Sequence, residues 1–357
     1  MRGSWNSVMK PVLEGDELVW IVEAVQSKLF WLDCLDEGPE GINARKHAQK
    51  QLKELKGGAG ENKWIRLIYF ICSRERIRIS TIKPARYSKW RNRIYLWLEM
   101  GKSRRLKKIY FTCPIKDIDG NPLKVPFRTT DKFITFYSYD SGIFRENKSS
   151  IDLHHILEFN GIDLGHVSHV QYVGTTFDPD LRVLRATSPG ANGGHAGYIR
   201  SKRACSLDGN DIFLYFHALK AIFLSASNKY GFLFSGTNYA AGILNAAEEG
   251  ELMEKALIVY FEPKQAANLE AEKSRLINMA KKHNVAEIRL CLDIEAPGSY
   301  FTYKSEVAPV SSSILGTINF TDRGVLIERH LDASFEELML SKWSSHNESA
   351  PKNPSSD

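Results

Sequence analysis

The chain has no long uninterrupted hydrophobic segment. Its longest apolar run, residues 211–223, is broken by His217 and Lys220, whereas a membrane-spanning helix needs about 20 mainly apolar residues. The start of the chain, Met1 to Trp5, also lacks the apolar stretch and the small-residue cleavage site of a signal peptide. We therefore expect a cytoplasmic protein without a membrane partner. Its 357 residues are 43% hydrophobic, enough to fill the cores of two ordinary domains.

Cysteine and the common catalytic motifs are equally scarce. No cysteine stands in a Cys-x-x-Cys pair or at the Cys/His spacing of a zinc site. The five cysteines are Cys34, Cys72, Cys113, Cys205 and Cys291. We expect buried or free thiols at these positions. The sequence also lacks a Walker loop, a dinucleotide fingerprint, HExxH and GxSxG. The glycines of residues 190–197 are not followed by Lys-Ser/Thr, so no nucleotide cofactor is predicted.

Acidic residues are rare in one segment, residues 45–108. It contains 20 Lys or Arg but only 4 Asp or Glu, a local balance of +16 in a chain whose net charge is +6. Such a segment favours a polyanionic partner, because neutralising phosphates releases their condensed counterions. Candidate phosphate-binding residues are Arg104, Arg105, Lys107 and Lys108.

Aromatic side chains alternate with these cations. They are Trp64, Tyr69, Phe70, Tyr87, Trp90, Tyr95 and Trp97. Rings in such a setting either stack on exposed bases or form a small core. For most of them the core interpretation is favoured, and base stacking stays open as the alternative.

The hydrophobic pattern changes along the chain. Residues 15–56 are predicted to be mainly helical, and residues 64–113 form strands, with residues 93–100 pairing with 106–113 as a hairpin. A turn signal at Asp119 to Pro122 marks a boundary. We predict a basic domain of residues 1–125, containing an N-terminal helical part and a β-rich nucleic-acid-binding part.

The second half alternates strands with helices. The predicted strands are 133–139, 167–173, 212–219 and 287–294, and the predicted helices are 151–159, one that begins at Pro179, one that contains Glu254, and 269–283. This order is typical of an α+β sandwich with a small mixed, partly antiparallel sheet. We assign it to a domain of residues 130–340. The tail, residues 345–357, is rich in Ser, Asn and Pro and is predicted to be disordered.

Two short segments carry the chemical signal. In residues 171–185 a strand is expected to end at Tyr172-Val173-Gly174 and to turn there. A helix would follow, capped by Asp178 and started by Pro179. Arg182 and Arg185 then lie one turn apart on the same helical face. In residues 254–263 a carboxylate, Glu254, stands among apolar neighbours on a later helix.

Together these segments resemble the GIY-YIG nuclease family over roughly residues 130–275. The matching features are Tyr-Val-Gly at 172–174, Arg182 eight positions later, Glu254, Pro263 nine positions after it, and Asn268. The resemblance implies a GIY-YIG-like α/β sandwich that hydrolyses phosphodiester bonds. It also implies roles for individual residues: Glu254 holds one Mg²⁺ or Mn²⁺ ion, Arg182 contacts the scissile phosphate, and Tyr172 lies near the nucleophile.

The family's first motif, Gly-Ile-Tyr, is not found in this sequence. The nearest match is Gly142-Ile143-Phe144, in which phenylalanine replaces the tyrosine. Tyr139, on the strand before it, is a candidate replacement if that strand pairs with residues 167–173. His195, in the glycine-rich loop, is a candidate base because imidazole titrates near neutral pH.

The sequence thus predicts a metal-dependent endonuclease that acts on nucleic acid. DNA is the favoured substrate, and by analogy the protein would serve in restriction, antiviral defence or a mobile element. One alternative is a protein that keeps the fold and binds DNA without cutting it. A second alternative is an RNA-binding or RNA-cleaving protein.

Overall fold

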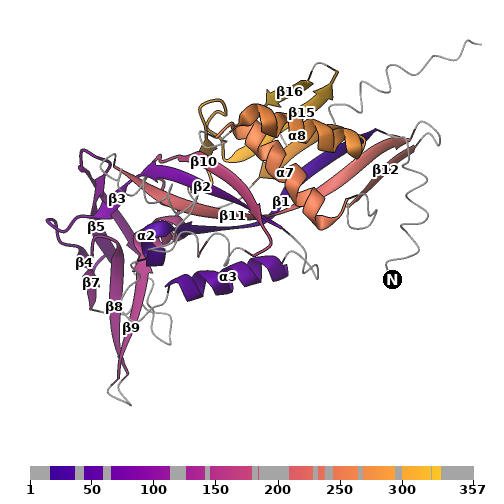
Figure 1. Ribbon diagram of the computed structural model, residues 1–357. Coiled ribbons are helices and arrows are strands. Elements are labelled where there is room, and N and C mark those ends of the chain that lie inside the picture. Colours follow the sequence, from indigo (N-terminus) through magenta and orange to yellow (C-terminus); the bar gives the residue numbers. More distant parts are fainter. Residues whose placement is uncertain are drawn as a thin grey trace, which may run out of the picture. The chain divides into compact units, whose positions relative to one another are not determined.

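The computed structural model describes residues 17–36, 44–58, 66–112, 126–140, 145–178, 184, 209–227, 232–237, 244–263, 268–293, 300–322 and 324–330. In these residues strands predominate over helices (Figure 1), so the predicted mixed α+β class is confirmed at that level. The chain forms two units. The first takes the described residues of 1–25, 219–294 and 305–357, and the second takes those of 26–218 and 295–304.

Two long strands contribute residues to both units, β1 (Leu18–Trp31) and β11 (Asn210–Ser227). The boundary predicted near residues 125–130 lies inside the second unit. Strand pairing explains this, because β2 (Leu67–Glu75) from the basic segment pairs along its whole length with residues 210–218 of β11. Segments that are distant in sequence therefore belong to the same unit.

The described residues of the first unit form an open sheet and two helices. Its further elements are β12 (Phe232–Thr237), α7 (Ala246–Phe261), α8 (Leu269–Lys282), β13 (Val285–Asp293), β15 (Ser313–Thr321) and β16 (Gly324–Arg329). β13 pairs in parallel with β1 and antiparallel with β15, which pairs in turn with β16. α7 and α8 lie side by side and pack against β15 and β13 (Figure 1). The predicted helices around Glu254 and after Asn268 are confirmed.

Both helices of this unit begin at an asparagine cap. The Asn245 side chain accepts from the backbone N–H groups of Ala247 and Glu248, and the Glu248 side chain accepts from the Asn245 backbone N–H. Asn268 accepts from the backbone N–H of Ala271. Each cap satisfies donors that the first helical turn leaves unpaired, and such caps typically contribute about 1 kcal/mol.

The described residues of the second unit form three helices and the strands of three sheets. The helices are α2 (Leu32–Asp36), α3 (Ala44–Gly58) and α4 (Leu153–Phe159), and the further strands are β3 (Ile77–Ile79), β4 (Arg86–Ser88), β5 (Arg93–Met100), β6 (Arg105–Thr112), β7 (Phe127–Thr129), β8 (Phe133–Asp140), β9 (Arg145–Asp152), β10 (Ser168–Thr176) and β14 (Tyr303–Lys304). The sheets have the orders β14-β10-β2-β11-β1, β3-β5-β4 with β6 on β5, and β7-β8-β9.

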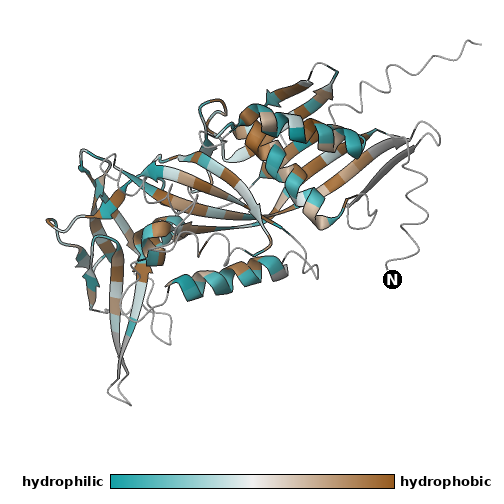
Figure 2. Cartoon of the chain, viewed as in Figure 1, coloured by the Kyte–Doolittle hydropathy of each residue, from teal (hydrophilic) through white to brown (hydrophobic). Residues whose placement is uncertain are grey.

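A single apolar stripe attaches α3 to the largest sheet of this unit. Ala48, Leu52 and Leu55 recur at helical spacing and are buried. They belong to one hydrophobic cluster with residues of β2 and β11, such as Leu67 and Phe216. Hydrophilic residues predominate along the rest of α3 (Figure 2). The helix predicted over residues 44–56 is therefore confirmed.

The other part of that prediction is wrong, because residues 18–31 form the strand β1. Trp20, Ile21 and Val22 are all buried, as expected for a strand covered on both faces. A short continuous apolar run fits a buried strand as well as a helix, so periodicity alone does not separate the two. The predicted hairpin of residues 93–100 and 106–113 is confirmed as β5 and β6.

Gly174 does not mark a turn, as the sequence had suggested. β10 continues through it to Thr176, and Gly174 stands opposite Tyr69 in the ladder. A Cβ atom at this position would lie 2.7 Å from Tyr172 Cε1 and 2.7 Å from Tyr69 Cζ. Glycine is therefore required here because two aromatic rings already fill the space.

The described cysteines, Cys34, Cys72 and Cys291, are free thiols as predicted. Burial raises the pKa of Cys291 to about 12, which leaves this thiol protonated and unreactive at neutral pH. Among the helices described, none has both the length and the apolar character that crossing a membrane requires.

Candidate nucleic-acid interface

Strand β5 has one apolar and one polar face. Ile94, Leu96 and Leu98 are buried on one side, while Arg93, Tyr95 and Trp97 alternate with them on the other and are half-buried. The sequence Arg-x-Tyr-x-Trp thus places one cation and two rings on a single side of a strand.

Neighbouring strands add to this side. Tyr95 stands opposite Tyr110 of β6 and Arg86 of β4, and Trp97 stands opposite Lys108. Directly opposed residues in antiparallel strands project from the same face. We call this surface the cation-ring face; its members are Lys83, Arg86, Arg93, Tyr95, Trp97, Lys108 and Tyr110.

Three cations of this face lie over its rings. The Arg93 guanidinium carbon is 4.4 Å from the centre of the Tyr110 ring. Lys108 Nζ is 4.9 Å from the Tyr95 ring and 5.8 Å from the Trp97 ring, and Lys83 Nζ is 4.1 Å from the Trp97 ring. Each contact is an attractive cation-π interaction. Because the rings already restrict these long side chains, less conformational entropy is lost when they bind an anion.

The charge of the surrounding segment is almost entirely positive. Residues 76–112 contain 12 Lys or Arg and one acidic residue, Glu99. Arg104 lies 3.9 Å from Glu99, whose side chain is mostly buried. The positive potential of the exposed cations is therefore hardly offset within this segment.

The four predicted phosphate-binding residues are all exposed, but they do not lie on one surface. Lys108 belongs to the cation-ring face, whereas Arg105 and Lys107 stand opposite Met100 and Leu98 and so point to the other side of β6. Arg104 lies in the β5-β6 turn with a φ of 50°. Lys83, Arg86 and Arg93 were not singled out from the sequence, although the alternation in β5 was a signal for Arg93.

The aromatic residues of the basic segment fall into buried, half-buried and exposed groups. The core interpretation is confirmed for Tyr69 and Phe70, which are buried in β2. Trp90 is an exception, because it lies in the β4-β5 turn and is 99% exposed. Tyr95 and Trp97 are half-buried on the cation-ring face, and Trp64 is outside the described residues.

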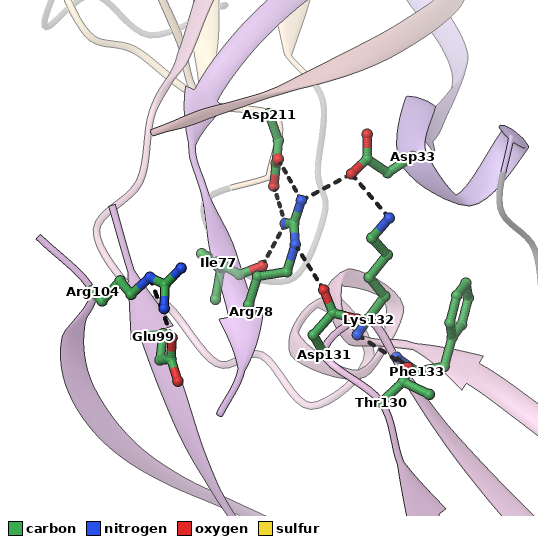
Figure 3. Close-up of polar contacts among 10 residues, drawn as sticks. All are labelled: Asp33, Ile77, Arg78, Glu99, Arg104, Thr130, Asp131, Lys132, Phe133 and Asp211. Carbon is green, nitrogen blue, oxygen red and sulfur yellow. Dashed lines mark hydrogen bonds and ion pairs between the residues drawn. The ribbon is translucent and has the colours of Figure 1, made fainter. Parts of the chain in front are cut away.

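A partly buried ion network connects β3, which belongs to the same sheet as this face, to three other parts of the second unit (Figure 3). The Arg78 guanidinium of β3 binds both carboxylate oxygens of Asp211 in β11, at 2.6 and 2.9 Å. It also binds Asp33 of α2 at 2.9 Å and lies 3.6 Å from Asp131 in the β7-β8 turn. Lys132 completes the network at 3.4 Å from Asp33.

The charges in this network depend on one another. Burial raises the pKa of Asp211, and the hydrogen bonds and charge of Arg78 oppose that rise. For Arg78, burial acts to lower the pKa, but the hydrogen bonds and charges of its aspartate partners, Asp211 first, outweigh it and leave the pKa raised. The network is therefore a set of paired charges that holds β3 in place.

The residues expected from the GIY-YIG resemblance are distributed over both units. Tyr172 lies on β10 in the second unit, where its half-buried ring stacks on Tyr69 with centroids 5.8 Å apart. Glu254 lies on α7 in the first unit and is half-buried. Asn268 is the N-cap of α8, a structural role that accounts for its position.

Several predicted residues cannot be placed in a site. Arg182, Arg185 and His195 lie outside the described residues. Tyr139 lies on β8, but its side chain is outside the described part. The pairing through which Tyr139 was expected to approach Tyr172 is not formed, because β8 pairs with β7 and β9.

Within the described ranges, no group of three or more His, Cys, Asp or Glu side chains is arranged to hold a metal ion. Comparison with known proteins adds no identification: no family model matches the chain, and no curated protein or solved structure matches it significantly.

Proposed function

We propose that this protein binds nucleic acid through the cation-ring face of its second unit. One observation carries the proposal: Lys83, Arg93 and Lys108 lie over aromatic rings on one side of a sheet. Cations supply the phosphate contacts that dominate affinity, and rings supply surfaces on which bases can stack. An acidic protein partner would need only the positive charges. Its binding would not explain why aromatic rings lie beside those charges.

The wild-type protein is expected to bind a fluorescein-labelled oligonucleotide with an affinity that falls steeply with salt. If about six cations contact phosphates, log Kd should rise with log salt concentration with a slope of about 4 to 5. Fluorescence anisotropy between 50 and 300 mM salt measures this slope. An oligonucleotide with an uncharged methylphosphonate backbone is the control. Equal affinity for the two oligonucleotides would show that the protein does not recognise the phosphate charges.

A second candidate function is the metal-dependent endonuclease, together with its GIY-YIG-like fold. The supporting observation is the position of Glu254: it is half-buried on α7, and Leu257 and Ile258, one turn further on, are buried. A carboxylate is also the kind of side chain through which proteins bind Mg²⁺. In this proposal Glu254 would hold one Mg²⁺ or Mn²⁺ ion, which lowers the pKa of a bound water and stabilises charge on the phosphate.

Glu254→Gln is expected to reduce cleavage of plasmid DNA by at least about 10²-fold, because the amide keeps the shape but removes the charge that holds the metal. Glu251→Gln, on the same helix, is the matched control and should cut like the wild type. Nicking assays with Mg²⁺ and with Mn²⁺ measure the rates. Cleavage by Glu254→Gln at the parental rate would exclude this residue as the ligand. A wild-type protein that binds DNA and RNA but cuts neither would leave binding as the function.

A further inference from the structure

The β4-β5 turn presents a tryptophan that the fold of the second unit does not use. Trp90 is 99% exposed and stands between two exposed cations, Lys89 and Arg91. The turn itself is fixed: the Tyr87 hydroxyl donates to Asn92 Oδ1 at 2.9 Å, and Asn92 has a left-handed backbone with a φ of 45°. A defined turn therefore holds an indole in solvent with both ring faces accessible.

Trp90 is also close in the chain to the cation-ring face. Arg93, three residues later, lies over the ring of Tyr110, which is itself 52% exposed. A lone exposed apolar side chain is ordinary, but an indole between two cations, close in the chain to a cation-covered tyrosine that is also exposed, has a chemical character of its own. Together these residues combine flat apolar surfaces with positive charge.

The exposure of two rings indicates which form of nucleic acid would fit. Trp90 is 99% exposed and Tyr110 is 52% exposed. In a duplex each base is paired and is stacked between its neighbours, so its flat face is not available to a protein ring. These rings can therefore accept bases only from a strand whose bases are unpaired.

We infer that the cation-ring face and the adjoining Trp90 bind single-stranded nucleic acid, with unpaired bases stacking on Trp90 and Tyr110 and phosphates contacting the neighbouring lysines and arginines. This inference rests on the proposed nucleic-acid binding and adds the class of ligand. Base stacking on aromatic rings tolerates any sequence, since every base has a flat π-face. The face does not need to read base edges.

The test compares three labelled ligands of one sequence, single-stranded DNA, single-stranded RNA and duplex DNA, with the full-length protein. The single strands are expected to bind at least about tenfold more tightly than the duplex. Trp90→Ala should weaken single-strand binding by about 5- to 100-fold, the range known for loss of one base-ring stack. Trp90→Phe keeps a ring and should restore most of the affinity. Duplex binding should change less than about twofold.

Ile82→Ala is the matched control, because Ile82 is another exposed apolar side chain, 81% accessible, that has no ring. It should bind like the wild type. Equal affinity for single strand and duplex, with no effect of Trp90→Ala, would overturn the inference and leave the proposed binding function intact. Failure of the wild type to bind any of the three ligands would overturn the proposed function itself. A preference of more than about tenfold between DNA and RNA would also contradict the inference, because ring stacking does not recognise the 2′-hydroxyl.

Discussion

Replacing Arg78 with methionine is expected to lower the free energy of unfolding of the second unit by about 2–4 kcal/mol, somewhat less than the cost of removing one partner from a fully buried ion pair. The guanidinium contacts Asp33, Asp131 and Asp211, and the Asp211 side chain is 4% exposed. Methionine fills a similar volume but leaves these carboxylates without their central cation. Urea denaturation at pH 7 measures the change.

Lys50→Met is the matched control for this substitution. Lys50 Nζ lies 3.9 Å from Glu54 on α3, and both side chains are mostly exposed. Surface pairs of this kind contribute at most about 0.5 kcal/mol, so this variant should unfold almost like the wild type. A similar small loss in Arg78→Met would mean that the network does not stabilise the fold.

Acid should partly rescue the Arg78 variant. Burial already raises the pKa of Asp211 in the wild type, and removing Arg78 removes the contact that opposes this rise. A carboxyl group whose folded pKa lies above its unfolded pKa destabilises the fold at neutral pH, and this penalty disappears as the pH falls through both values. The stability difference between wild type and variant should therefore narrow from pH 7 towards pH 4.5. A constant difference would contradict this account.

The second large effect concerns binding. Changing Lys83, Arg93 and Lys108 together to glutamine is expected to weaken binding of a single-stranded oligonucleotide by about 10²-fold or more at 50 mM salt. All three cations belong to the cation-ring face, and glutamine keeps much of each aliphatic stem while removing the charge. Loss of three phosphate contacts should affect every sequence alike, because these contacts do not read bases.

An equal change of charge elsewhere is the control for the triple variant. Lys50, Lys53 and Lys281 are exposed lysines on α3 and α8. Their combined replacement by glutamine should reduce affinity by less than about threefold. If both triple variants lost the same affinity, the binding would follow net charge, and the cation-ring face would have no special role.

Local sequence patterns predicted much of the fold correctly. The alternation in residues 93–100 and the short turn after it gave the β5-β6 hairpin. The helices α3 and α8 also lie within segments that were predicted to be helical. These features depend on neighbouring residues, whose spacing is visible in the sequence.

Features that depend on distant pairing were not predicted. β1 was assigned to a helix because an apolar run does not reveal that β11 and β13 will pair with its two edges. The expected turn at Gly174 was wrong because its requirement for glycine comes from Tyr69, in another strand. The Arg78 network joins residues from 33 to 211, and nothing in the local sequence around Arg78 indicates its partners.

The candidate site was also predicted only in part. Charge composition located the basic segment and included Lys108, but it did not separate the cation-ring face from Arg105 and Lys107 on the other side of β6. Knowledge of the β5-β6 register was needed for that step. The exposure of Trp90 was not predicted, because the exposure of a turn residue depends on how the turn packs.

The salt dependence of binding tests the central proposal most directly. The wild type and the Lys83, Arg93 and Lys108 triple variant would be titrated on one single-stranded oligonucleotide at several salt concentrations. If these cations contact phosphates, the slope of log Kd against log salt should be smaller in the variant by about 2, and the two affinities should converge at high salt. Parallel lines with the same slope would show that the three cations of the cation-ring face do not contact the nucleic acid.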